Sequence, residues 1–281
     1  MFNIISSFCE KGSASVNEDA IFVSDNCLAV IDGATGLNNI HLTSSDSDAA
    51  YLSNRLSELL NESNLDDIPA TLKEAAFIIK QELDALGYDL ENSYPSAGIA
   101  IAKINDDMLD CYTLGDPLIL LKHKNSAMIS IQDKSLVELD DLAINKMIEL
   151  HEKTGCSIFK ARQQINDLLI ENRLKMNTPD GYYIFDPTGV GIDYINYFSI
   201  PVEDVKSIAL MTDGFYAVQF CYNIVEDNKE LLNLLLNNKI DFLIDKLKEL
   251  SYNDDNLNIY PRFKVMDDVS IIVSKISVRW Q

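Results

Sequence analysis

The stretch NEDAIFVSDNCLAVIDG, residues 17–33, carries the strongest structural signal in the sequence. Two apolar runs flank the turn-forming pair Asp25-Asn26, a pattern that predicts a β-hairpin. A two-residue loop at this pair places Asp19 opposite Asp32 across the open end of the hairpin. Like charges directly opposed destabilise a sheet by a few tenths to about 1 kcal/mol. The two carboxylates therefore favour a cation between them.

Blocks of strand-like and helical sequence follow this hairpin. The expected helices show one apolar stripe each and lie at 49–60, 72–86, 140–175, 228–236 and 240–250. The expected strands lie at 97–104, 108–114, 118–123, 127–131, 194–200, 205–211 and 269–278. Grouped strands and grouped helices are typical of an α+β fold with antiparallel sheets. We expect a single domain over 1–281 with a helical insertion at about 140–176, because no linker composition flanks that segment.

Composition excludes several classes of protein. Among 281 residues, 47% are hydrophobic, and 23 basic against 44 acidic residues give a net charge of −21. This charge repels nucleic acid and anionic membrane surfaces, so we expect neither as a partner. Five cysteines without a CxxC pair favour a reducing cytoplasm over a disulfide framework or a zinc site. No stretch approaches 18 consecutive apolar residues, and the first residues lack the pattern of a secretory signal.

Four short motifs join an apolar strand run to an acidic residue. They are LAVIDG ending at Asp32-Gly33, YTLGD at Asp116, ALMTDG at Asp213-Gly214, and MDDVSIIV opening with Asp267-Asp268. Acidic residues at strand ends can meet at one edge of a sheet, and hard cations such as Mg²⁺ and Mn²⁺ take oxygen ligands. The motifs therefore predict a site for divalent cations.

The ordered set of motifs resembles the metal-dependent protein phosphatase 2C family of serine/threonine phosphatases, in its bacterial form. The similarity rests on NEDAIFV, AVIDGATG, YTLGD, LMTDGF and DDVSIIV, and it runs from about residue 12 to 277. The resemblance implies a four-layer α-β-β-α sandwich with two central antiparallel sheets. It also implies two Mn²⁺ or Mg²⁺ ions at one end of the sandwich, with a weaker third.

The same resemblance assigns roles to individual residues. It implies that Asp32 bridges two metals, that Asp213 and Asp267 complete the first metal's ligands, and that these three acids are the catalytic set. It places the Gly33 carbonyl, Glu18 and Asp19 on the second metal or its waters, and Asp116 with Asp213 on the third. A hydroxide that bridges the metals would attack phosphorus, so no side-chain nucleophile is required.

One departure from the family pattern concerns the substrate phosphate. Family members often carry an arginine ahead of the NED motif, whereas no Lys or Arg occurs between residues 12 and 54 here. Lys11 is the nearest basic residue, and we expect it to be a weak phosphate contact. Two functions follow. The first is a phosphomonoesterase acting on phosphoserine and phosphothreonine in proteins. The alternative is a catalytically impaired regulatory or binding protein with the same fold.

Overall fold

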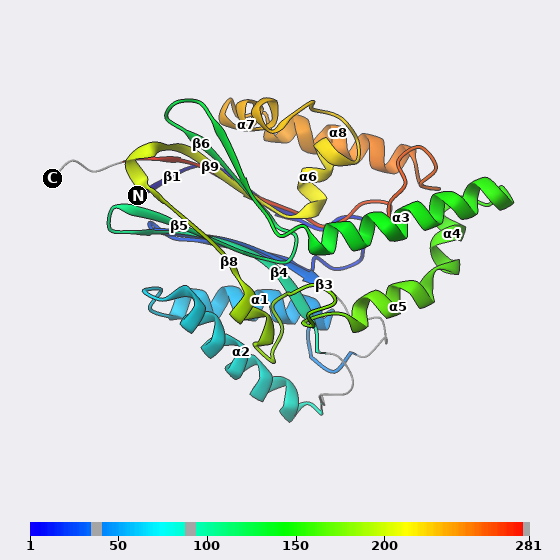
Figure 1. Cartoon of the computed structure of the whole chain (residues 1–281), viewed down its shortest axis with the longest axis horizontal. Helices are drawn as coiled ribbons and strands as arrows, with labels where there is room; N and C mark the ends of the chain where they lie inside the picture. The colour runs from blue at the N-terminus through cyan, green and yellow to red at the C-terminus, as the bar shows by residue number, and fades with distance from the viewer. Residues whose placement is uncertain (35–40, 88–93, 278–281) are drawn as a thin grey trace.

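Two antiparallel sheets of five strands lie face to face at the centre of the protein, with helices on both outer faces (Figure 1). The computed structural model describes residues 1–34, 41–87 and 94–277. Thr35 and Gly36 of the AVIDGATG motif, and Val278 of the expected last strand, lie outside the described residues. The arrangement confirms the predicted α+β class and the four-layer α-β-β-α sandwich.

The strands of the two sheets are interleaved along the chain. One sheet has the order β1-β10-β9-β6-β7, formed by Phe2–Glu10, Val269–Ile276, Val205–Met211, Leu118–His123 and Met128–Ile131. The other has the order β2-β3-β4-β5-β8, formed by Asp19–Val23, Cys27–Ala34, Ser96–Asn105, Met108–Leu114 and Asn196–Pro201. All the ladders are antiparallel, and short turns join β2 to β3, β4 to β5 and β6 to β7.

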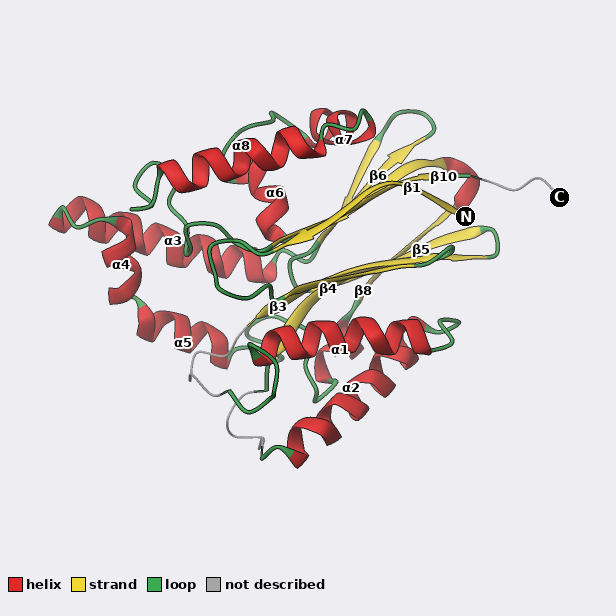
Figure 2. Ribbon diagram, turned by 180° about the vertical axis from the view of Figure 1, so that it is seen from behind, coloured by secondary structure: helices red, strands yellow, loops and turns green. Residues whose placement is uncertain are grey.

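The helices form two outer layers and a cover at one end. Helices α1 (Asp48–Glu62) and α2 (Ile68–Ala85) lie on the β2-containing sheet, whereas α6 (Asp213–Phe220), α7 (Asn228–Leu236) and α8 (Ile240–Asn253) lie on the other. Helices α3 (Ser135–Thr154), α4 (Ile158–Gln164) and α5 (Asn166–Leu174) extend from the α6 side to the α1 side at the end opposite the N-terminus (Figure 2). Two short 3₁₀ helices, Val190–Tyr194 and Val202–Asp204, flank β8.

Three hydrophobic cores hold the layers together, and each strand face serves a different core. In β10, Ile272 points into the core between the sheets, whereas Ile271 points to the core beneath α6, α7 and α8. Both side chains are fully buried. The period of two along a strand explains why β10 is apolar on both faces.

Several elements differ from the sequence expectation. Strand β1 and helix α6 were not expected, and the helical segment begins at Ser135 rather than near 140. The strand expected from residue 194 begins at Asn196, because 190–194 form a 3₁₀ turn. Strand β1 was not predicted because it is an edge strand with only one buried residue, Phe2, and therefore lacks a clear alternation.

No helix of the described ranges combines the length and the apolar character needed to cross a bilayer.

The two faces of the first sheet predict unequal losses of stability. Ile272→Ala removes buried atoms between the sheets and should lower the free energy of unfolding by about 2–5 kcal/mol. Ile4→Ala, at a side chain 40% exposed on β1, should lower it by less than about 1 kcal/mol. Urea unfolding of both variants measures the difference. Equal losses would contradict the assignment of Ile272 to the inter-sheet core.

Candidate metal centre

The β2–β3 hairpin places the first two acidic residues. Asp19 lies directly opposite Asp32 in the antiparallel ladder, and the Ser24 amide donates to the Cys27 carbonyl at 2.8 Å to close the turn. This confirms the predicted hairpin, its register and the opposed carboxylates. Asp19 is buried. The repulsion predicted from the sequence is therefore present inside the protein, where water screens it weakly.

Three carboxylates form the tightest acidic group among the described residues. Asp32 of β3, Asp116 of the turn between β5 and β6, and Asp213 at the start of α6 each offer an oxygen, and these oxygens lie within 4.8 Å of one another. The sequence predicted that these motif acids meet, and the structure brings these three together. Asp116, which the resemblance assigned to the weaker third metal, lies in the group.

Asp267 lies at the edge of this group, just before β10. It lines the same cleft as Asp116 and Asp213. Its Oδ1 accepts hydrogen bonds from Lys264 Nζ at 2.7 Å and from the Asp268 amide at 2.9 Å. Asp267 is therefore held by its own loop, and its side chain is 33% exposed.

Glu18 and Asp19 are positioned by contacts from the opposite sheet. Asp19 Oδ2 accepts a hydrogen bond from Thr212 Oγ1 at 2.9 Å. The Asp268 carboxylate accepts from the Gly12 amide and from the Glu18 amide, each at 2.8 Å. Asp268 thus ties the loop that carries Glu18 to the start of β10, which makes it a positioning residue.

Glycine follows two of the acids because the backbone there is crowded. A Cβ on Gly33 would overlap the carbonyl oxygen of Glu18, and a Cβ on Gly214 would overlap that of Asp268. Each Asp-Gly motif therefore marks a point where one acidic motif crosses another. The metal contact assigned to the Gly33 carbonyl stays a prediction.

Burial and mutual repulsion dominate the electrostatics of the group. Burial, and then the negative charges of neighbouring acids, raise the pKa values of Asp19, Asp32 and Asp213 well above the ordinary range. Burial, and then the charge of Asp140, raise the pKa of Asp116 to about 7. Clustered carboxylates are the oxygen donor set that a hard divalent cation requires, so Mn²⁺ or Mg²⁺ fits these residues.

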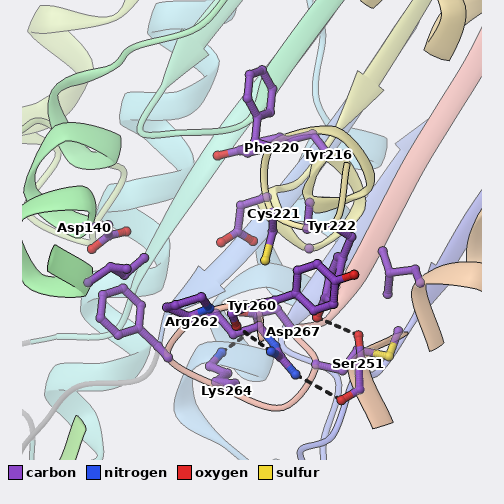
Figure 3. Close-up of a pocket in the computed structure, with 18 of the residues that line it drawn as sticks. Asp140, Tyr216, Phe220, Cys221, Tyr222, Ser251, Tyr260, Arg262, Lys264 and Asp267 are labelled. Atoms are coloured by element: carbon purple, nitrogen blue, oxygen red, sulfur yellow. Dashed lines mark hydrogen bonds and ion pairs between the residues drawn. The ribbon is translucent and has the colours of Figure 1, made fainter. Parts of the chain in front are cut away.

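A cleft of about 470 Å³ opens beside the acids, between α3, α6 and the loop that precedes β10 (Figure 3). Aromatic side chains such as Tyr216, Phe220 and Tyr260 line much of it. Asp140 of α3 also lines the cleft, and burial and then the charge of Asp213 raise its pKa to about 7. Asp140 was not among the predicted site residues, because the helical pattern of its segment says nothing about what its polar face meets.

Basic residues at the cleft differ from the sequence expectation. Lys11 donates to the Ser15 carbonyl at 3.1 Å and is not among the residues that line the cleft. Lys264, which was not predicted, lines it beside Asp267. Burial lowers the pKa of Lys264, but the charges of Asp267 and Asp213 outweigh burial and raise it overall. Lys264 lies in a loop, and the sequence pattern gave no signal for its place at the cleft.

Comparisons with known proteins place the fold. No family model matches the chain, and no curated protein matches its sequence. Solved structures do match. The serine/threonine phosphatase PstP of Mycobacterium tuberculosis is 14% identical with a TM-score of 0.57, over 97% of this chain and 98% of that one. PppA of Pseudomonas aeruginosa, a regulatory component of the type VI secretion system, is 14% identical with a TM-score of 0.56, over 97% and 96%. Stp1 of Staphylococcus aureus, a serine/threonine phosphatase, is 16% identical with a TM-score of 0.53, over 99% and 96%.

The chain therefore has the fold of bacterial serine/threonine phosphatases, which confirms the fold that the sequence resemblance implied. One of the matching structures is the catalytic domain of PstP in complex with two manganese ions.

The raised pKa values predict how metal and pH act on stability. Because Asp116 and Asp140 have folded pKa values of about 7, above the ordinary value of about 3.9, the metal-free protein takes up protons on folding. The stability that these two groups contribute is present at low pH and is lost as pH rises through about 7. We expect a lower Tm at pH 8 than at pH 6 in EDTA, by roughly 2–4 °C for each kcal/mol by which the free energy of unfolding falls.

Divalent metal should reverse this trend, because cations and protons compete for the same carboxylates. Mn²⁺ should raise the Tm more at pH 8 than at pH 6, as measured by differential scanning fluorimetry. A Tm shift by Mn²⁺ that is equal at both pH values would argue against binding at these acids.

Proposed function

We propose that this protein is a metal-dependent phosphomonoesterase that removes phosphate from phosphoserine and phosphothreonine in proteins. The observation that carries the proposal is the convergence of Asp32, Asp116 and Asp213 within 4.8 Å at one end of a phosphatase fold. Two of the matching structures, PstP and Stp1, are named as serine/threonine phosphatases, which supports the substrate class. The three acids come from separate motifs, so their convergence does not follow from local structure alone.

The proposed cofactors are two Mn²⁺ or Mg²⁺ ions, with a weaker third. The proposed ligands are Asp32 between the two ions, Asp213 and Asp267 on the first, Glu18, Asp19 and the Gly33 carbonyl on the second, and Asp116 on the third. When bound, such ions lower the pKa of water and neutralise phosphoryl oxygens, which is the chemistry that phosphate ester hydrolysis requires. The two manganese ions in the matching PstP structure support this number and metal.

The residues of the chain contribute position and access. Strand ends and the start of α6 fix the acids, while Asp268 and Thr212 hold Glu18 and Asp19 in place through hydrogen bonds. The cleft beside the acids admits the segment that carries the phosphate. Burial raises the pKa values of Cys27 to about 12 and Cys221 to about 11, so neither thiol is suited to act as a nucleophile near neutral pH.

We further propose that residues 1–281 form one catalytic domain in which the helices α3, α4 and α5 are an insertion that contacts the substrate protein. The five cysteines are unpaired, which supports a cytoplasmic location. The net charge of −21 argues against nucleic acid as a partner. No observation specifically favours the alternative, a catalytically impaired binding protein, and the grouping of Asp32, Asp116 and Asp213 supports the enzyme.

Removing one ligand should separate metal chemistry from folding. Asp213→Asn should lower Mn²⁺-dependent hydrolysis of a phosphothreonine peptide by about 100-fold or more. It should also raise the Tm in EDTA, because it removes one of the repelling charges. Asp241→Asn, at an exposed position on α8, is the matched control and should change neither quantity. Full activity in folded Asp213→Asn protein would rule out the proposed centre.

A small substrate distinguishes the enzyme from the impaired alternative. We expect the wild-type protein to hydrolyse p-nitrophenyl phosphate with a KM above about 1 mM, the upper end of common values, because the metals supply most of the affinity. Activity should rise steeply with millimolar Mn²⁺ and vanish in EDTA. Metal binding measured by calorimetry without any hydrolysis would instead favour the binding protein.

A further inference from the structure

The cleft beside the candidate metal centre carries negative charge where a negatively charged substrate would bind. Asp116, Asp140, Asp213 and Asp267 all line the cleft, and a phosphate ester carries two negative charges near neutral pH. Among the described residues that line the cleft, the basic ones are Arg262 and Lys264. Lys11, the nearest basic residue to the NED motif, is not one of them. A cation that contacts the phosphate should therefore be sought in the loop before β10.

Arg262 uses all of its hydrogen-bond donors within the protein. Its Nη1 donates to Asp254 Oδ2 at 2.8 Å and to the Tyr260 carbonyl at 2.6 Å. Its Nη2 donates to the carbonyls of Ser251 and Asp254 at 3.0 and 2.9 Å, and its Nε donates to that of Val265 at 3.0 Å. A guanidinium has five N–H donors, and these five bonds use all of them. Arg262 therefore shapes the loop and has no donor for a ligand.

Lys264 lies in the same loop as Arg262 but still has hydrogen-bond donors available for a ligand. An ammonium has three N–H donors. One hydrogen bond from Lys264 to a described residue is present, to Asp267 Oδ1 at 2.7 Å. The side chain is 49% exposed, so a ligand in the cleft can reach it. Figure 3 shows Lys264 directed to Asp267 and Arg262 directed to Ser251.

We propose that Lys264 binds the phosphate of the substrate, and of the product, beside the metal ions. This inference rests on the proposed function, since it deepens the same site. Its contact with Asp267 keeps the ammonium next to a proposed metal ligand, which is where the oxygens of a metal-bound phosphate would lie within reach of its remaining donors. A charge-assisted hydrogen bond of this kind is stronger than a neutral one. Lys264 thus supplies the cation that is missing ahead of the NED motif.

Inorganic phosphate binding tests the proposal without turnover. In Mg²⁺, isothermal titration calorimetry should give a Kd about tenfold weaker for Lys264→Met than for wild type, the effect of losing one such bond. Lys264→Arg should stay within about threefold, because charge and donors remain. Lys248→Met is the matched control. Lys248 pairs with Glu10 at 2.9 Å and is 40% exposed, outside the cleft, and its loss should leave the Kd unchanged.

A structural role for Lys264 gives a different result. If Lys264 only neutralises the acids of the metal-free protein, Lys264→Met should bind Mg²⁺ more tightly and bind phosphate as wild type does, and this would overturn the proposal. A tenfold loss in Lys11→Met or Arg173→Met, with Lys264→Met unaffected, would overturn it as well. Arg173 is included because it donates to the Ala34 carbonyl at 3.2 Å near the site.

Chemical footprinting of the wild-type protein does not depend on any variant folding. Acetylation of Lys264, followed by mass spectrometry, should slow about tenfold when phosphate and Mg²⁺ are both present, whereas acetylation of Lys248 should not change. Unchanged labelling of Lys264 would contradict the proposal. If the wild-type protein hydrolyses no phosphate ester, the proposed function fails, yet calorimetry and footprinting still decide whether Lys264 binds phosphate. If it does hydrolyse them, Lys264→Met should raise KM about tenfold with little change in kcat.

Discussion

Repulsion between buried carboxylates is the constraint on which the rest of this structure depends. Asp19 faces Asp32 across a hairpin, and Asp32, Asp116 and Asp213 lie within 4.8 Å of one another at the end of the sandwich. Such a group is unfavourable in a weakly polar interior, and the three hydrophobic cores must hold it in place. For Asp32 the sheet itself does this, because β3 is paired with β2 on one side and with β4 on the other. A divalent cation converts the same repulsion into binding energy.

The fold was predictable where local pattern and tertiary role agree. The Asp25-Asn26 turn and the apolar runs around it set the hairpin register, and the strands β4, β5, β6 and β9 follow their apolar runs closely. Prediction failed for β1 and α6. Nearly all of β1 is half-buried or exposed, so its pairing with β10 leaves little trace in its pattern. Helix α6 begins at Asp213-Gly214, a pair typical of turns, and Gly214 is there because Asp268 passes close by.

In the candidate site, too, some residues could be predicted from the sequence and others could not. Asp32, Asp116 and Asp213 could be found from the sequence because each ends or follows an apolar strand run, and strand ends meet at one edge. Asp140 and Lys264 could not. Asp140 lies on a helix whose pattern records only its buried face, and Lys264 lies in a loop whose path depends on Arg262 and Asp254. The strength of that ion pair is set by its environment, since Arg262 and Asp254 are only 12% and 4% exposed. The spacing of residues along the sequence does not predict such an ion pair.

The two walls of the cleft share a small hydrophobic core of their own. Leu257, in the loop before β10, packs with Ala143 and Met147 of α3 and with Ile158 of α4 in a cluster distinct from the sandwich cores. Asp140 and Lys264 are therefore positioned by this cluster and by Arg262, whereas Asp32, Asp116 and Asp213 are positioned by strands and by α6. Substitutions within the small cluster should therefore shift Lys264, and Asp267 with it, relative to the acids Asp32, Asp116 and Asp213. The fold thus keeps three acids fixed by strand ends and by α6 beside a wall whose geometry depends on few side chains.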